Sequence, residues 1–286
     1  MWLYLVALVG FWTLLRLFRE RQAVTNMKLL IVASQAVSRA VKNQKKRKYH
    51  AAIPAHLYHT ANLLCGSLFF SLSLGLWGLV NNAGISVFAI NEWQNKQDFV
   101  KVLDVNLLGL IDVTLNMLPL VRKARGRVVN VASVMGRVSL FGGGYCISKY
   151  GVEAFSDSLR RELSYFGVKV AIIEPGGFKT NISNSERVSH IMKKLWDQSS
   201  SEVKEIYGEK FLDSYLRASK LLMNTCSEDL SMVTDCMEHA LTSCHPRTRY
   251  SAGWDAKLFY LPMSYLPTFL LDAIYYWGSG KPAQAL

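Results

Sequence analysis

A tyrosine and a lysine, Tyr145 and Lys149, stand four residues apart in the run YCISK. On a helix this spacing places the phenol and the ammonium on one face. A cation beside a phenol stabilises the phenolate and lowers its pKa from the ordinary value of about 10. A tyrosine tuned in this way can take the proton of an alcohol while the carbinol carbon gives up a hydride. The pair predicts a proton-transfer site. The same spacing occurs by chance on many exposed helices, so by itself it supports such a site only weakly.

Further polar residues are candidates for the same site because of their positions relative to the expected strands and helices. Ser133 lies twelve residues before Tyr145, after an expected strand, and its hydroxyl can hold the same substrate oxygen. Asn106 lies in an expected helix and could order water behind Lys149. Asn-Asn-Ala-Gly at 81–84 and Pro175-Gly176 also follow expected strands, in that order. This combination is far more specific than the Tyr-Lys spacing.

The elements that must position these residues are strands alternating with helices. Apolar runs at 76–80, 127–132 and 168–173 are expected strands, and 99–118 and 145–166 are expected amphipathic helices. Such alternation indicates βαβ units, and therefore an α/β fold with a Rossmann-like, doubly wound parallel sheet covered on both faces. Ligands of these sheets bind beyond the carboxyl ends of the strands, where the polar residues above are expected.

An uncharged run at residues 2–15 is followed directly by Arg16, Arg19 and Arg21. A cleaved signal would carry basic residues before the apolar run and small residues after it, and neither is present. We therefore expect an uncleaved membrane anchor at 1–21. The arginines favour a cytosolic domain, but one short anchor leaves the side of the membrane open.

The chain is mostly helical in pattern beyond residue 185, and its last part is strongly apolar. Residues 258–277 are rich in aromatic and aliphatic side chains, and Pro262, Pro267 and Asp272 argue against a spanning helix. Three interpretations stay open: an apolar substrate lid, a surface that dips into a membrane, and a buried core.

Composition excludes several classes of protein. Half of the 286 residues are hydrophobic and 19% are charged, which excludes a disordered chain. Five cysteines without a C-x-x-C pair exclude a disulfide scaffold and suggest a reducing compartment. Cys236, His239, Cys244 and His245 match no standard zinc spacing, so we expect helix packing and no metal.

The net charge of +12 first suggests an anionic partner. The run KNQKKRK at 42–48 could bind nucleic acid, but no aromatic platform accompanies it. We favour a solvated basic segment near a membrane surface and expect no nucleic-acid partner.

Together these motifs resemble the short-chain dehydrogenase/reductase family. Over 1–25 and 75–286 the chain resembles the microsomal retinol and 3α-hydroxysteroid dehydrogenases, the subgroup that includes the type 6 17β-hydroxysteroid enzyme. The stretches GRVVNVAS, GGGYCISKYGVEAFSDSLRREL and FGVKVAIIEPGGFKTN carry the closer match.

The resemblance implies a role for each matching residue. Tyr145 would be the general base, Lys149 would lower its pKa and bind the nicotinamide ribose, and Ser133 would orient the substrate oxygen. Asn106 would complete the relay. The implied cofactor contacts, besides Tyr145 and Lys149, are Asn82, Ala83, Gly84, Pro175, Gly176 and Thr180.

The same resemblance implies a function and a location. The chain would oxidise all-trans-retinol or 3α-hydroxysteroids such as androsterone, with NAD preferred over NADP. It would reside in the endoplasmic reticulum membrane, in contact with lipid, and a homodimer is compatible with it.

The segment before residue 75 departs from the family pattern. A Rossmann site needs a glycine-rich turn after its first strand and an acidic or basic residue about 20 positions later. Residues 28–33 could form that strand, but Ser34-Gln35-Ala36 follows, and Gly66 is the only glycine at 22–74. No acid occurs from Arg21 to Asn91.

We therefore divide the chain into an anchor at 1–21, an aberrant basic segment at 22–74 and a catalytic core at 75–286. The interval is also too short for the expected half-domain, which needs about 30 residues per βαβ unit. Either the chain binds a dinucleotide poorly and is catalytically impaired, or an unusual loop replaces the glycines. Bulkier residues obstruct close pyrophosphate approach, which favours the first interpretation.

Overall fold

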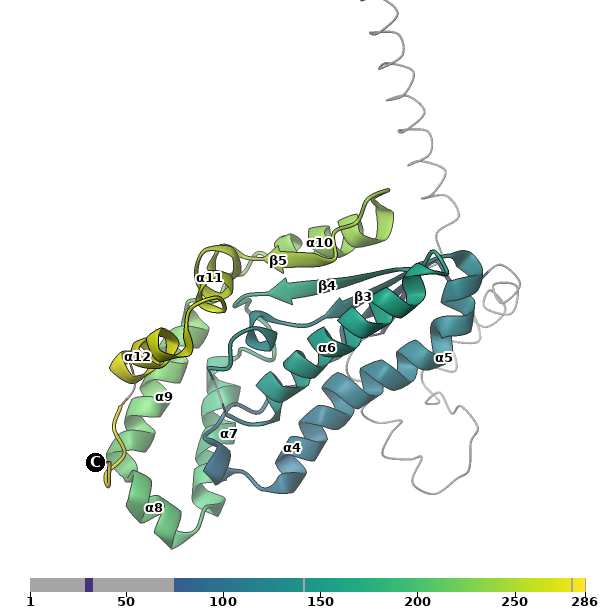
Figure 1. Cartoon of the computed structure of the whole chain (residues 1–286). Helices are drawn as coiled ribbons and strands as arrows, with labels where there is room; N and C mark the ends of the chain where they lie inside the picture. Colours follow the sequence, from purple (N-terminus) through teal and green to yellow (C-terminus); the bar gives the residue numbers. More distant parts are fainter. Residues whose placement is uncertain (1–28, 33–74, 141, 279, 286) are drawn as a thin grey trace, which may run out of the picture.

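A parallel sheet organises the protein in the computed structural model, which describes residues 29–32, 75–140, 142–278 and 280–285. In this part of the chain the strands follow one another in sequence order across the sheet (Figure 1). They are β1 (Leu29–Val32), β2 (Gly78–Asn81), β3 (Arg127–Val131), β4 (Lys169–Pro175) and β5 (Arg249–Ala252). The expected strands are confirmed to within two residues at each end. The predicted anchor at 1–21 and the basic run at 42–48 lie outside the described residues.

Helices cover both faces of the sheet, as the doubly wound fold predicts. Helices α5 (Gly109–Ala124) and α6 (Gly144–Ser164) pack on the face that carries Leu79 and Val128. Helix α10 (Ser231–Thr242) packs on the other face, against the neighbouring residues Val80 and Val129. Successive strand residues point to opposite faces, so each strand is buried on both sides.

The helix expected at 99–118 is longer and is interrupted. It begins as α4 (Lys96–Leu103), passes through a π-helical turn at Asp104–Leu108 and continues as α5. Asn95 sets the start because its side chain accepts the backbone N–H groups of the first turn in a capping box. The helix continues past Pro119, and Val121 beyond it is fully buried against the sheet.

By length and composition, one described stretch, Lys96–Ala124, could cross a membrane. Its buried side chains, including Leu110 and Val121, pack into the sheet core instead.

Most of the remaining helices lie beyond the carboxyl ends of the strands, in the lower left of Figure 1. These are α7 (Ser185–Gln198), α8 (Ser201–Tyr207), α9 (Glu209–Asn224), α11 (Leu261–Met263) and α12 (Thr268–Gly278). The apolar stretch 258–277 is divided between a π-helical turn at Ala256–Tyr260, α11 and α12, and α12 begins directly after Pro267. Proline disrupts continuous helical hydrogen bonding, which is why no single long helix forms.

Candidate active site

Tyr145 and Lys149 are both buried on the first turns of α6, with 7% and 4% of their surface exposed. The Lys149 Nζ lies 5.7 Å from the centre of the Tyr145 ring and donates a hydrogen bond to the Val131 carbonyl at 2.9 Å. The structure therefore brings the pair together beside the carboxyl end of β3.

A glycine fixes the start of α6 and so the position of the pair. Gly143 has a φ of +87°, which glycine adopts without strain, and its N–H donates to Asn91 Oδ1 at 2.6 Å. A Cβ at this position would lie 2.7 Å from Gln94 Nε2.

Burial dominates the electrostatics of the pair. It raises the pKa of Tyr145 to about 12, although a hydrogen bond with Ser133 acts in the opposite direction. It also lowers the pKa of Lys149 to about 8, against the attraction of the Glu153 carboxylate. Removal of the phenolate from water is the largest influence on Tyr145 in this structure, so its pKa shift is upward, and the lowering of the phenol pKa by Lys149 stays a prediction.

Ser133 links the end of β3 to the other site elements. Its Oγ accepts the Met135 N–H at 3.2 Å, which starts a short 3-10 turn, and it lies 3.5 Å from the Pro175 carbonyl oxygen. Because the same hydroxyl contacts Tyr145, a substrate oxygen held here would meet both side chains.

Asn106 lies in the π-helical turn and is completely buried. Its Oδ1 accepts the Ile85 N–H at 2.8 Å, and its Nδ2 donates to the Ile85 carbonyl at 2.9 Å and to Ser148 Oγ at 3.0 Å. The Asn106 side chain thus holds the segment after β2 against α6 through these three hydrogen bonds. A π-helical turn at a functional residue is a common arrangement, but no hydrophobic periodicity announces it.

The residues after β2 leave space beside the Asn106 side chain. A Cβ placed on Gly84 would be 3.6 Å from Asn106 Oδ1 and 3.8 Å from Lys149 Nζ, so Gly84 lies between them. Asn82 is exposed, and Ala83 is partly exposed. Of the expected cofactor contacts at this strand end, the structure places Gly84 beside Lys149.

The turn after β4 is held by a residue that sequence reasoning missed. Asp255 accepts the Gly177 N–H at 2.6 Å, and a Cβ on Gly176 would lie only 2.2 Å from Asp255 Oδ1. Thr180 is exposed and its Oγ1 accepts the Ile182 N–H at 3.3 Å. Asp255 follows β5, far along the chain, and no motif marks it.

A buried series of side-chain hydrogen bonds, which the sequence did not predict either, connects β2 and β3 to α5 and α6. Asn81 Nδ2 donates to Thr114 Oγ1 at 2.9 Å and to Asn130 Oδ1 at 2.8 Å, and Asn130 donates to Ser156. Asn81 Oδ1 has no hydrogen-bond partner within the described residues. Single polar residues inside apolar strands form no periodic pattern from which such a series of hydrogen bonds could be predicted.

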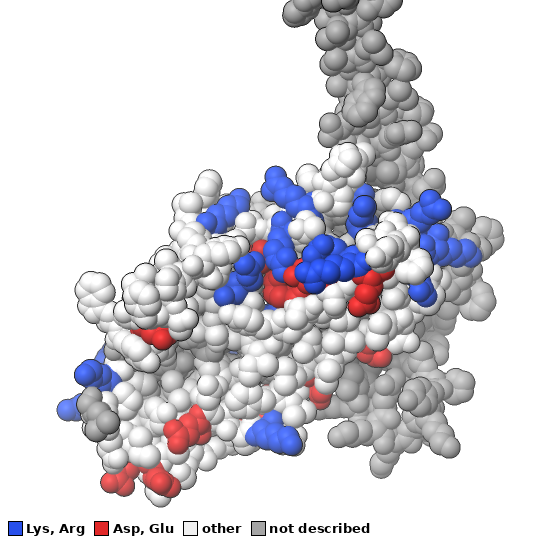
Figure 2. Space-filling model, viewed as in Figure 1, with Lys and Arg blue, Asp and Glu red and all other residues white. Residues whose placement is uncertain are grey.

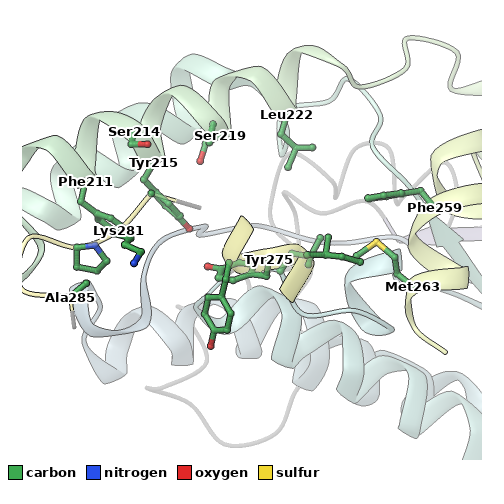
Figure 3. A pocket seen from close by; sticks show the side chains of 16 residues that line it. Phe211, Ser214, Tyr215, Ser219, Leu222, Phe259, Met263, Tyr275, Lys281 and Ala285 are labelled. Atoms are coloured by element: carbon green, nitrogen blue, oxygen red, sulfur yellow. The ribbon is translucent and has the colours of Figure 1, made fainter. Parts of the chain in front are cut away.

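An apolar pocket of about 760 Å³ lies between α9 and α12 (Figure 3). Helix α9 provides Phe211 and Tyr215, and Tyr275 of α12 closes the opposite side. Leu140 and Tyr215 line this pocket and also pack against the core cluster that contains Tyr145. The C-terminal stretch therefore forms one wall of a pocket that is connected to the cluster of Tyr145 through Leu140 and Tyr215.

The possible zinc ligands have other roles. Cys236 and His239 lie on α10, and His239 Nδ1 is 2.9 Å from the Tyr250 hydroxyl. In the described ranges no three His, Cys, Asp or Glu residues gather closely enough to hold a metal ion.

The described residues fit the nicotinamide half of a dinucleotide. Lys149 Nζ uses one acceptor, Val131, which leaves donors for ribose hydroxyls, and Gly84 leaves room beside it. The pyrophosphate half lacks its glycines in the sequence, because Ser34-Gln35-Ala36 follows β1. The fit is therefore confined to one half of the cofactor.

The chain is similar in sequence to a known family and to several of its members. A family model described as short chain dehydrogenase matches residues 69–190. Retinol dehydrogenase 7 and retinol dehydrogenase 16 of Mus musculus are 61% and 58% identical, and 17-beta-hydroxysteroid dehydrogenase type 6 of Mus musculus is 45% identical. All three cover 100% of both chains.

Solved structures show the same fold. A short-chain dehydrogenase from Streptomyces avermitilis has a TM-score of 0.56 at 21% identity and covers 89% of this chain and 86% of its own. A short chain dehydrogenase/reductase from Burkholderia phymatum, solved in complex with NAD, has a TM-score of 0.58 at 18% identity and covers 94% and 92%. With the sequence relatives, this shows that the chain belongs to the short-chain dehydrogenase/reductase family, in the group of retinol dehydrogenases 7 and 16 and 17-beta-hydroxysteroid dehydrogenase type 6.

Proposed function

We propose that the chain oxidises a lipophilic secondary or allylic alcohol to the carbonyl with NAD, acting on all-trans-retinol, on 3α-hydroxysteroids such as androsterone, or on both. One observation carries the proposal: Tyr145, which contacts Ser133 and faces Lys149, belongs to an apolar cluster that continues into the pocket of about 760 Å³. A pocket of this size suits a small molecule, and its apolar walls suit a lipophilic one.

In the proposed reaction, Ser133 and Tyr145 hold the alcohol oxygen between their hydroxyl groups. Tyr145 in its phenolate form takes the alcohol proton at Oη, and Lys149, while protonated, stabilises that phenolate. NAD, when bound, would accept the hydride and place a positive charge near the phenol. The polar reacting groups lie among buried apolar side chains, which exclude water from the reacting carbon.

The pKa values favour oxidation at alkaline pH. The Tyr145 pKa of about 12 leaves little phenolate at neutral pH, so the base form increases as the pH rises. Lys149, with a pKa of about 8, loses its stabilising charge as the pH rises above about 8. The proposal therefore includes a rate that rises from neutral pH and levels off as Lys149 deprotonates.

The finer parts of the proposal rest on the resemblance and on the relatives' names. NAD rather than NADP is inherited, because the ribose-reading residues are missing from this sequence. A membrane location rests on the uncharged run at 2–15, and the endoplasmic reticulum rests on the resemblance to the microsomal dehydrogenases. For a homodimer, exposed apolar residues on α5 and α6, such as Leu115 and Ile147, offer a contact surface.

A second candidate is a membrane-tethered protein without a competent dinucleotide site. It is favoured by the single glycine at 22–74 and by the alignment with retinol dehydrogenase 7, which runs over 317 residues although this chain has 286. Part of the relatives' length therefore has no counterpart here.

Microsomes that express the full chain test the two candidates. Turnover of all-trans-retinol or androsterone with NAD supports the enzyme, and Tyr145→Phe should reduce it about 10²- to 10⁴-fold, the usual contribution of a general base. Equal turnover by Tyr145→Phe would contradict the assigned base. Absence of turnover together with absence of NADH binding, measured by fluorescence titration, would establish the second candidate instead.

A further inference from the structure

Helix α12 exposes an apolar face, the reverse of what a helix on a water-facing surface shows. Phe269, Tyr276 and Trp277 have 70%, 71% and 93% of their surface exposed. Together with exposed Ala273 they follow one another at spacings of four, three and one residues, which makes a single stripe. Ile274, Tyr275 and Tyr276 line the pocket, so Tyr276 belongs both to the stripe and to the pocket wall.

The stripe is part of a larger surface, which we name the C-terminal aromatic patch. Eleven of the nineteen exposed large apolar side chains in the described part of the chain fall within residues 254–277. The patch is defined here by the six most exposed of them: Trp254, Leu258, Tyr265, Phe269, Tyr276 and Trp277. Figure 2 shows this end of the molecule, over α11 and α12, as largely white, whereas charged side chains gather elsewhere on the same face. Exposed apolar surface of this extent marks an interaction site.

The composition of the patch indicates a lipid bilayer as its occupant. Five of its six members are aromatic, and tryptophan and tyrosine are the residues enriched at membrane–water interfaces. Cations lie on its aromatic rings: Lys257 Nζ is 5.4 Å from the Trp254 ring centre, and the Arg137 guanidinium is 5.6 Å from that of Tyr265. This pairing of aromatic rings and cations matches the boundary between acyl chains and anionic headgroups.

The length of α12 determines how it can meet the bilayer. Its eleven residues are about half of what a spanning helix needs, so it can lie in the plane of the interface but cannot cross. Asp272, an exposed acid of α12, lies three residues after Phe269 and four before Tyr276, so it borders the stripe and its carboxylate would lie at the level of the headgroups.

The patch is continuous with the pocket. Phe259, Tyr275 and Tyr276 line the pocket and are also at least 42% exposed, so one set of side chains faces both the cavity and the outside. Seating the patch on a bilayer would therefore place the pocket wall against lipid.

We infer that the C-terminal aromatic patch docks in the interface of an anionic bilayer, with α12 parallel to the surface, so that a lipophilic substrate passes between the acyl chains and the pocket. The docking stands on the patch alone, and only the passage of substrate rests on the proposed function.

Tryptophan quenching in the full chain tests the docking without requiring catalysis. The chain is reconstituted in vesicles of phosphatidylcholine with a minority of phosphatidylserine, with and without brominated phosphatidylcholine. If Trp254 and Trp277 meet lipid as well as Trp2 and Trp12 of the predicted anchor, Trp277→Phe removes about a quarter of the emission that bromolipid quenches. Trp93→Phe is the matched control, because Trp93 is buried and its indole N–H has no hydrogen-bond partner within the described residues. It should leave the quenched emission unchanged.

A charge on the stripe gives a second measurement. Phe269→Glu should reduce the quenching of Trp277, and Leu115→Glu, at an exposed apolar residue of α5, should not. Equal quenched emission in Trp277→Phe and Trp93→Phe would overturn the docking. So would a wild-type chain that is dimeric in detergent and becomes monomeric with Phe269→Glu, because a second copy would then occupy the patch.

Discussion

At the scale of single residues, the site places a phenol and an ammonium where water is excluded. Burial raises the pKa of Tyr145 and lowers that of Lys149, so both side chains resist the charged form in this structure. An isolated buried charge costs free energy, and proteins retain such groups chiefly at functional sites. Lys149, which is charged at neutral pH while Tyr145 is not, is thus expected to reduce stability in order to serve chemistry.

Replacing Lys149 should therefore stabilise the protein. The Lys149 pKa of about 8 lies below the unfolded value of 10.5, so from pH 8 to 10.5 the unfolded state binds more protons and stability rises with pH. A shift of this size corresponds to a burial penalty on the order of 3 kcal/mol at neutral pH. Lys149→Met should raise the free energy of unfolding near pH 7 and remove this alkaline rise, as measured by denaturant titrations across the range.

Lys101, an exposed lysine of α4, provides the control for that measurement. Lys101→Met should keep the alkaline rise. A Lys149→Met protein with the wild-type pH slope would show that Lys149 is not the group responsible.

At the scale of elements, the close approach of distant segments shapes the site. The turn after β4 receives Asp255 from the segment after β5, and Gly176 and Gly253 leave the space that its carboxylate fills. A Cβ on either glycine would lie within 2.5 Å of Asp255 Oδ1. The turn that holds Pro175 and Gly176 therefore depends on residues almost eighty positions away.

Gly176→Ala should consequently destabilise the protein by about 1–3 kcal/mol, the usual cost of overpacking. Asp255→Ala in the same chain should recover part of the loss, because the clashing carboxylate is gone, and a double-mutant cycle measures this coupling. Gly84→Ala is the matched control, since a Cβ there meets its nearest atom at an ordinary 3.6 Å. Additive effects of the two substitutions would contradict the proposed contact.

Sequence patterns predicted the strands and α6 well because each is a continuous apolar or amphipathic run. They placed Tyr145, Lys149, Ser133 and Gly84 near one another because parallel strands end at the same edge of a sheet. The π-helical turn at Asn106 was not predicted, since one extra residue per turn leaves no mark in a hydrophobic pattern. Asp255 was not predicted either, because nothing local shows which distant backbone N–H a carboxylate will accept.

At the scale of the whole molecule, partly buried ion pairs connect α6, β4 and β5. Arg249 contacts the Glu153 and Asp157 carboxylates, each at 2.9 Å, and Arg137 contacts Glu174 at 3.0 Å. Burial raises the pKa of Glu153 to about 7, with the Glu174 carboxylate as a further cause, although Arg249 opposes both. The network thus includes a carboxyl group that titrates near neutral pH.

Stability should for this reason fall as the pH rises from 4.5 to about 7. The Glu153 pKa of about 7 lies above the unfolded value of 4.5, so its contribution is complete below pH 4.5 and is lost as the pH passes about 7. Glu153→Gln should flatten the decline in thermal midpoint over this range. Glu228→Gln, the same change in an exposed ion pair, should retain the decline. An unchanged profile in Glu153→Gln would assign the decline to another group.

The sheet also shows where the molecule differs from its family. A Rossmann sheet has two further strands beyond its first, yet in the described part of the chain β1 lies at the edge. Residues 22–91 carry seven basic side chains and no acid, which accounts for +7 of the net charge of +12. The charge excess therefore coincides with the segment in which the cofactor glycines are missing.

Exchange of this segment should restore cofactor binding. A chimaera in which 22–74 is replaced by the corresponding segment of Mus musculus retinol dehydrogenase 7 keeps the described site, because Tyr145, Lys149 and the turn after β4 all lie beyond it. Glycines at the first turn would let the pyrophosphate approach a helix N-terminus, and bulkier residues at such a turn would obstruct that approach. Fluorescence titration should show micromolar NADH binding by the chimaera and at least tenfold weaker binding by the native chain, about 1.4 kcal/mol or more. Equal micromolar binding by both would show that an unusual loop replaces the glycines, and the native chain would then meet the cofactor requirement of the proposed oxidation.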